Sequence, residues 1–236
     1  MSGASKRARR EPGSAGGAGP PMLGRLEGRA GAFLAALSAS PRNLAIFCAA
    51  LIGLAGIVFA RTAWMSDDAY ITLRTLDNFV HGHGLRWNVA ERVQSFTHPL
   101  WLFVMLIPYA ITREAFHTVA ILSLLISTLT VALLVWRYRK RPGAVLAGMA
   151  ALLFSRAFTD YSTSGLENPL THLLLALFVI RFPEDRPSGK DLLVLAGIAG
   201  LAALNRLDTI LLFGPGVAIA WARHGFGRGI RLVVAG

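Results

Sequence analysis

An apolar run near the N-terminus, Leu44-Ala-Ile-Phe-Cys-Ala-Ala-Leu-Ile-Gly-Leu-Ala-Gly-Ile-Val-Phe-Ala60, contains no charged side chain. A helix of this length is able to cross the hydrocarbon core of a bilayer. The polar stretch Trp64-Met-Ser-Asp-Asp-Ala-Tyr70 follows it. The carboxylates of Asp67 and Asp68 are therefore expected beside the lipid headgroups, on the side of the membrane away from the N-terminus. An enzyme whose substrate is attached to a lipid needs a base at this level.

The composition indicates the class of protein. The chain has 54% hydrophobic and only 16% charged residues, with a mean hydropathy of +0.52. Such a composition is too apolar for a soluble domain, and the apolar residues form blocks separated by short charged loops. The single cysteine, Cys48, excludes an intrachain disulfide. We therefore predict an all-α, polytopic membrane protein.

The net charge of +11 does not indicate a nucleic-acid-binding protein, because of where the charge lies. Lys6, Arg7, Arg9 and Arg10 belong to a tail rich in Gly, Pro, Ser and Ala, without hydrophobic periodicity. We expect residues 1–42 to be a disordered, basic, cytoplasmic tail. An alternative for residues 23–37 is a basic helix lying on anionic lipid.

Six apolar blocks are candidates for membrane spans: Leu44–Ala60, His117–Trp136, Gly143–Phe158, Pro169–Ile180, Leu192–Leu204 and Leu207–Trp221. A seventh, Pro99–Ile111, is shorter and is predicted to dip into the membrane without crossing it. With that block re-entrant, most of the 24 Lys and Arg residues lie on the side of the N-terminus, as the positive-inside rule requires. We therefore predict about six spans, a cytoplasmic N-terminus, and a transmembrane domain over residues 43–236 with a catalytic outer loop at 62–115.

This topology places the acidic residues of three loops together on the outer face. In the first loop, residues 68–80 are predicted to form an amphipathic helix at the interface, with Asp67, Arg74 and Asn78 on one face. The alternative for Asp67 is a helix N-cap without a further role. Because polar groups at membrane depth usually line a cavity or a pathway, one outward-facing site is the simplest arrangement.

Further candidates follow along the chain. Glu91 and Arg92 precede Pro99, which is suited to the first position of a helix, so His98 stands at a helix N-terminus where anions bind. His98 or Arg92 is a candidate phosphate ligand, and interfacial anchoring is the alternative. In the second loop Glu167 precedes a span, where it can cap the helix or position a sugar hydroxyl. In the third loop Arg206 and Asp208 are substrate ligands or simply an ion pair.

These motifs, taken in order, resemble the glycosyltransferase-C superfamily of polytopic enzymes that use polyprenyl-phosphate sugars. The resemblance is carried by Asp67-Asp-Ala-Tyr-Ile71, Leu73-Arg74, Asn78, Gly82-x-Gly84, Asn88-x-x-Glu-Arg-Val93, Thr97-x-Pro-Leu-Trp101, Ser164-Gly-Leu-Glu167 and Arg206-x-Asp208. Within the superfamily the chain is most similar to the branch of the mycobacterial terminal β-(1→2) arabinofuranosyltransferase. Members of that branch are several hundred residues longer, so the chain is expected to be an N-terminal portion or a truncated product.

The resemblance implies a function in the bacterial plasma membrane, in polysaccharide biosynthesis of the cell envelope. It implies that Asp67 is the catalytic base and that Asp68 contacts the acceptor or a divalent metal such as Mg²⁺ or Mn²⁺. The acceptor would be a glycan, lipid or protein. A polyprenyl phosphate leaves readily, so one carboxylate base suffices, and in-line attack would invert the anomeric centre. Arg74, Arg92 or His98 would stabilise the departing phosphate.

Two other classes of function stay open at the level of sequence. Charges within a membrane also mark the substrate paths of transporters, including lipid transporters. A non-catalytic or truncated membrane subunit would carry the same apolar blocks. A nucleic acid is not expected as a partner.

Overall fold

The computed structural model describes residues 22–91, 93–183 and 185–225, and this part of the chain contains helices and no strand. The elements are α1 (Met22–Ala39), α2 (Pro41–Arg61), α3 (Asp67–Val80), α4 (Pro99–Thr112), α5 (Ala115–Tyr138), α6 (Pro142–Phe154), α7 (Arg156–Tyr161), α8 (Asn168–Arg181), α9 (Gly189–Asn205), a 3₁₀ turn η1 (Leu207–Thr209) and α10 (Ile210–His224).

Two helices, α2 and α5, are long and apolar enough to cross a membrane. Only 17% of the most apolar window of α2 and 33% of that of α5 is buried, whereas the core helix of a soluble protein is mostly covered. The structure therefore fits an all-helical membrane protein. The other four expected spans, α6, α8, α9 and α10, are 13, 14, 17 and 15 residues long, and their crossing of the membrane stays a prediction.

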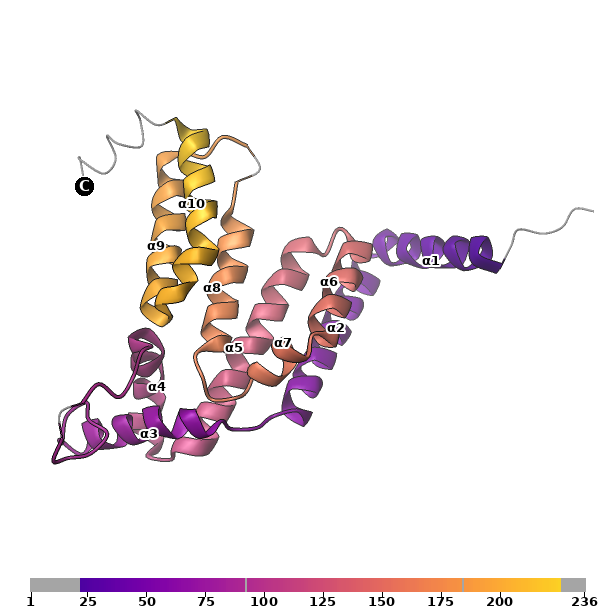
Figure 1. Cartoon of the computed structure of the whole chain (residues 1–236). Coiled ribbons are helices and arrows are strands. Elements are labelled where there is room, and N and C mark those ends of the chain that lie inside the picture. The colour runs from indigo at the N-terminus through magenta and orange to yellow at the C-terminus, as the bar shows by residue number, and fades with distance from the viewer. Residues whose placement is uncertain (1–21, 92, 184, 226–236) are drawn as a thin grey trace, which may run out of the picture.

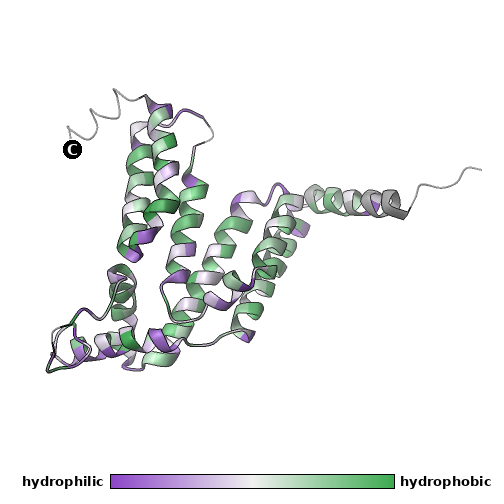
Figure 2. Cartoon of the chain, viewed as in Figure 1, coloured by the Kyte–Doolittle hydropathy of each residue, from purple (hydrophilic) through white to green (hydrophobic). Residues whose placement is uncertain are grey.

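The long helices run back and forth between two ends of a bundle (Figure 1). α5 packs against both α2 and α8, α8 packs against α9, and α9 packs against α10. Hydrophobic residues follow the lengths of these helices, and hydrophilic ones gather in the loops and at the helix ends (Figure 2). The end that carries α3 also carries the turn before α8 and the η1 turn, whereas residues 139–141, 182–183 and 185–188 lie at the opposite end.

The helix predicted in the first loop is confirmed as α3, which lies across one end of the bundle (Figure 1). Its location at a membrane interface stays a prediction. Its apolar side is buried through Leu73 and Leu76, and these contact Trp101 and Met105 of α4 in the main core. α4 thus packs between α3 and the bundle and anchors the loop. Whether α4 enters the membrane stays a prediction.

Two expected boundaries are corrected. The block Gly143–Phe158 is not one helix, because the chain leaves α6 at Ser155, whose hydroxyl accepts a hydrogen bond from the Phe158 backbone N–H and begins α7. Residues 22–39 form α1, so this part of the 1–42 segment is helical, as the alternative for residues 23–37 expected. Residues 1–21 lie outside the described part.

Candidate functional site

One open cavity of about 800 Å³ lies where motif residues of the three predicted outer loops meet. Its wall comes from one face of α3, the segment before α4, the turn before α8 and the η1 turn. The lining residues are Asp68, Ile71, Thr72, Gln94, Ser95, Phe96, Thr97, His98, Leu166, Glu167, Arg206, Leu207 and Asp208. The predicted convergence of the three loops is therefore present in the structure.

The turn that carries Glu167 is buried and held from several sides. The Ser66 backbone N–H donates to the Ser164 carbonyl at 2.9 Å, and the Trp101 indole N–H donates to the Gly165 carbonyl at 3.0 Å. Gly165 has φ +81°, and a Cβ there would lie 2.2 Å from the Met65 sulfur. Only glycine combines this backbone conformation with so close an approach of the segment before α3.

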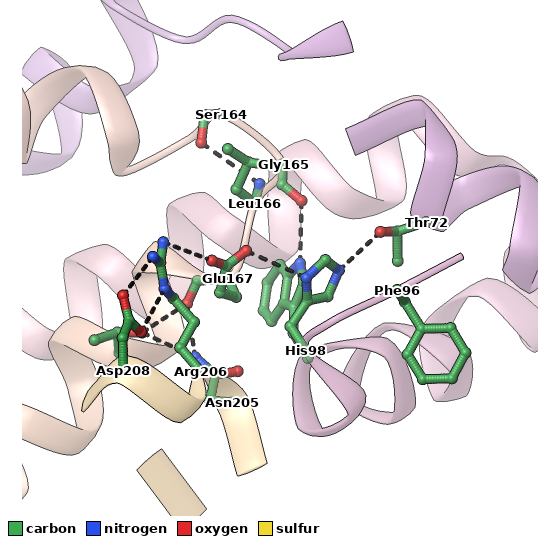
Figure 3. Close-up of polar contacts among 12 residues, drawn as sticks. Thr72, Phe96, His98, Ser164, Gly165, Leu166, Glu167, Asn205, Arg206 and Asp208 are labelled. Carbon is green, nitrogen blue, oxygen red and sulfur yellow. Dashed lines mark hydrogen bonds and ion pairs between the residues drawn. The ribbon is translucent and has the colours of Figure 1, made fainter. Parts of the chain in front are cut away.

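Glu167 is the centre of a charged network (Figure 3). The residue is buried, with only 6% of its surface exposed. Its carboxylate accepts a hydrogen bond from Arg206 Nη1 at 3.0 Å. The same guanidinium donates to both oxygens of Asp208, at 3.0 and 2.6 Å. These hydrogen bonds to Arg206 lower the pKa of Asp208, and the pairing with Asp208 raises the pKa of Arg206. The predicted Arg206–Asp208 pair is thus present, and it extends to Glu167.

His98 continues the network toward α3 (Figure 3). Its Nε2 lies 2.8 Å from the Thr72 hydroxyl, and its Nδ1 lies 3.5 Å from Glu167 Oε2. Burial lowers the pKa of His98, and the nearby Glu167 carboxylate only partly opposes this. In the neutral tautomer with its proton on Nδ1, that proton faces the Glu167 carboxylate, and Nε2 accepts a hydrogen bond from the Thr72 hydroxyl. The side chain is therefore a neutral link between α3 and Glu167 rather than a free cation for a phosphate.

The two aspartates at the start of α3 differ in position. Asp68 is exposed and lines the cavity, where its carboxylate has no hydrogen-bond partner among the described residues. Asp67 does not line the cavity, and its Oδ1 accepts from the Asp68 backbone N–H at 3.1 Å and from the Ser66 hydroxyl at 3.4 Å. Ser66 occupies the N-cap position. The cavity wall therefore singles out Asp68 of the pair.

Three other predicted substrate ligands lie away from the cavity wall. Arg74 donates to the Trp87 carbonyl at 3.0 Å and stacks on the Trp87 ring, 4.6 Å from its centroid. Asn78 donates to the same carbonyl at 2.9 Å, and Glu91 accepts from Asn88 at 3.3 Å. These side chains hold the loop after α3 in place. Arg92, the remaining candidate, lies outside the described residues.

Sequence reasoning missed Thr72, Gln94 and Phe96 as parts of the wall. Thr72 was within reach, because it lies one helical turn after Asp68 and so shares its face. The sequence predicts a functional face of α3 that contains Asp67 and Arg74. The face that lines the cavity contains Asp68 and Thr72, so it is rotated about the helix axis by one residue. Gln94 and Phe96 belong to a segment without helical or strand periodicity, so no pattern indicates their direction.

A metal site was expected only as an option on Asp67 and Asp68. Within residues 22–91, 93–183 and 185–225, no group of three or more His, Cys, Asp or Glu side chains is placed to hold a metal ion. The role of a divalent ion at the carboxylate pair stays a prediction.

Comparison with known proteins finds two similar curated relatives, both described as terminal β-(1→2)-arabinofuranosyltransferases. The chain is 29% identical to the Corynebacterium glutamicum protein over 137 residues, which are 54% of this chain and 20% of that protein. It is 29% identical to the Mycobacterium tuberculosis protein over 192 residues, which are 73% of this chain and 31% of that protein. The chain thus covers less than a third of the length of each relative. No family model and no solved structure matches it.

Proposed function

We propose that the protein is a membrane glycosyltransferase that moves a sugar from a polyprenyl-phosphate donor to an acceptor hydroxyl on the outer face of the plasma membrane. The names of the two relatives support a glycosyl transfer, and the bundle supports a membrane location. The observation that carries the proposal is the Asp68 carboxylate, which has no hydrogen-bond partner among the described residues and shares one cavity with the Glu167–Arg206–Asp208 network.

In the proposed reaction a carboxylate takes the proton of the acceptor hydroxyl while the oxygen attacks the anomeric carbon of the donor. The bond from that carbon to the phosphate oxygen breaks, and the polyprenyl phosphate leaves with the bonding electrons. Attack opposite to the leaving group inverts the anomeric centre. The resemblance to glycosyltransferases assigns the base to Asp67, whereas the cavity wall favours Asp68, with Asp67 as the neighbour that fixes its backbone.

The departing phosphate needs a positive partner. Arg206 is the cation that lines the cavity in the described part of the chain, and its side chain is 44% exposed. Because Asp208 and Glu167 already hold its fork from two sides, the guanidinium is fixed in orientation before a substrate arrives. The 72% exposed Leu207 lies on the same wall, where it gives the lipid part of the donor an apolar approach.

The test introduces Asp68→Asn and Asp67→Asn separately into the full-length protein. Each variant is expressed in membranes that lack the unsubstituted protein. Transfer from radiolabelled polyprenyl-phosphate arabinofuranose into endogenous acceptors is measured, together with the amount of folded protein. Removal of a general base is expected to reduce the rate by at least about 100-fold. We expect this loss in Asp68→Asn and a smaller one in Asp67→Asn.

Asp185→Asn is the matched control, because Asp185 is exposed and outside the cavity wall. It should retain full transfer. If Asp67→Asn alone abolishes transfer, the base is Asp67. If both single variants keep normal transfer, neither carboxylate is the base and the proposed mechanism is wrong.

A further inference from the structure

The end of the bundle opposite the candidate site carries a cluster of basic side chains. α5, α8 and α10 all end there (Figure 1). Arg137, Arg139 and Lys140 lie in or just after the last turn of α5, and Arg223 lies in the last turn of α10. Basic residues in this position are favoured by the helix dipole, and they also follow from the positive-inside rule. Charge alone therefore does not indicate a ligand.

The shape of this end adds an independent observation. Two open cavities, of about 400 and about 480 Å³, have Arg137 in the walls of both. The first also has Arg139 and Lys140 in its wall, and the second has Arg223. Both continue into apolar walls, through Leu133 and Ile180 in the first and through Phe178 and Val179 in the second. Each cavity thus combines cations with an apolar surface, as an amphiphilic ligand requires.

Aromatic rings hold the cations at the mouths of these cavities. Arg139 lies over the ring of Trp136 at 4.1 Å, and Arg137 lies over the ring of Tyr138 at 5.3 Å. Arg223 lies 5.8 Å from the Phe182 ring. Trp136 is 62% exposed, and tryptophan is enriched where membrane proteins meet lipid headgroups. The guanidinium groups are therefore positioned without being neutralised.

No carboxylate compensates this charge in the described part of the chain. Arg137, Arg139, Lys140 and Arg223 form no ion pair with a described Asp or Glu, and neither cavity wall contains an acidic residue. The second wall is also braced, because Arg186 donates to the carbonyls of Arg223 and His224 at 3.0 and 3.1 Å. Arg139 Nη1 already donates to the Trp136 carbonyl at 2.6 Å, which fixes its guanidinium. The result is a preformed cationic site without a described carboxylate partner.

We propose that these two cavities bind the headgroup phosphate of an anionic phospholipid, with its acyl chains along the apolar walls of α5 and α8. Basic pockets between membrane helices on the cytoplasmic side bind such headgroups. Each cavity holds its own phosphate: Arg137 contacts it in both, with Arg139 beside it in the first cavity and Arg223 in the second. The site is independent of the glycosyl transfer proposed above, since it lies at the other end of the bundle.

The test uses the full-length protein in two kinds of nanodisc. One contains phosphatidylcholine alone, and the other contains phosphatidylcholine with about 20% phosphatidylglycerol, which makes the bilayer anionic. Lipid that stays bound after extraction is counted by native mass spectrometry. We expect retained phosphatidylglycerol on the natural protein. Each of Arg137→Gln and Arg139→Gln should reduce its retention by about fivefold, from about 1 kcal/mol per basic residue near an anionic surface.

Arg156→Gln is the control, because Arg156 is an exposed cation that pairs with Asp160 and lies outside both cavities. It should retain the lipid as the natural protein does. Circular dichroism of each variant separates loss of binding from loss of fold. Equal retention in all variants, or an equal fall in the control, overturns the proposal. Displacement of the lipid by 10 mM inorganic phosphate, about the level of an ordinary buffer, would show a simple anion site instead and would also overturn it.

Discussion

The neutral side chain of His98 connects the charged network around Glu167 to α3. It is buried between Thr72 and Glu167, and burial lowers its pKa in the folded protein. A second residue that acts through its position is Gly165. Because it has no Cβ, the turn before α8 approaches Met65, just before α3, and Ala69 at the start of α3. Both residues act through position rather than through reaction with a substrate.

Protonation of His98 should destabilise the fold at low pH. The folded pKa lies below the unfolded value of about 6.5, so above that value neither state binds the proton and stability is unaffected. As the pH falls below it, the unfolded state binds more protons and stability decreases, until the folded pKa is passed. Thermal unfolding between pH 7.5 and about 4.5 measures this. The variant His98→Gln should show a smaller loss, and an equal slope in both proteins would contradict the prediction.

Substitution of Gly165 by alanine should destabilise the protein by about 2–4 kcal/mol, from overpacking and from the strained backbone together. The added Cβ would contact Met65 and Ala69 at 2.2 and 2.9 Å. Thermal unfolding in detergent measures the change. Gly82→Ala is the matched control, because Gly82 has φ +83° but nothing within 4 Å of an added Cβ. If both variants lose the same stability, the contact with Met65 contributes nothing.

At the scale of elements, α4 is the brace that joins the loop after α2 to the bundle. Trp101, fully buried, lies in the main core and donates to the Gly165 carbonyl. α4 therefore holds the turn of Glu167 at the same time as it holds α3. A change in α4 is expected to reach both walls of the cavity.

The variant Trp101→Phe should lose about 1–3 kcal/mol of stability, because the buried carbonyl of Gly165 is left without a donor. Chemical unfolding followed by fluorescence measures this. Trp64→Phe is the control: the Trp64 indole also donates to a carbonyl, that of Asp160 at 2.8 Å, but its residue is 45% exposed. Water can replace the donor there, so the loss should be much smaller. A similar loss in both would contradict the role given to burial.

The sequence predicted elements whose signals are local. The face of α3 and its approximate ends follow from helical periodicity and from the polar residues at its start. The break between α6 and α7 was missed, because a serine within an apolar block is a weak signal until its hydroxyl is seen to cap the next helix. The start of α9 was placed too late, although Ser188 and Asp191 form a capping box that could have been recognised.

The site was predicted in outline but not in detail, for a physical reason. Charge and topology bring the three loops to one end, and this needs only the order of the apolar blocks. Which of two adjacent carboxylates faces a cavity depends on a rotation of α3 by one residue. That rotation is set by Leu73 and Leu76 packing on α4, a contact between distant parts of the chain.

At the scale of the whole molecule, the two ends of the bundle are chemically distinct. The cavity with Asp68 and Glu167 is lined in part by α3, and the cationic cavities are lined by the last turns of α5, α8 and α10. Figure 1 shows these elements at opposite ends of the bundle. The bundle between them is covered with exposed apolar side chains, including Leu125 at 61% and Leu211 at 84%. Such a surface is suited to lipid rather than water.

Cysteine labelling tests this arrangement. In a Cys48→Ala background, Val89→Cys and Tyr161→Cys should react with a membrane-impermeant maleimide on intact cells, whereas Lys140→Cys and Arg186→Cys should react only after permeabilisation. All four residues are exposed at the surface of the described part of the chain. The first two belong to different loops that the proposed function places on one side. Labelling of Val89→Cys and Tyr161→Cys from opposite sides would contradict both the topology and the proposed enzyme.

The turn at Gly165 also has a consequence for biogenesis. Its upstream partners, Ser66 and Trp101, leave the ribosome before it, but Arg206 leaves about forty residues later. During that interval the Glu167 carboxylate has no guanidinium to neutralise it, although the surrounding helices are already being inserted. The pocket is thus completed late in synthesis, and a nascent chain stalled before Arg206 would carry the Glu167 carboxylate without its guanidinium partner.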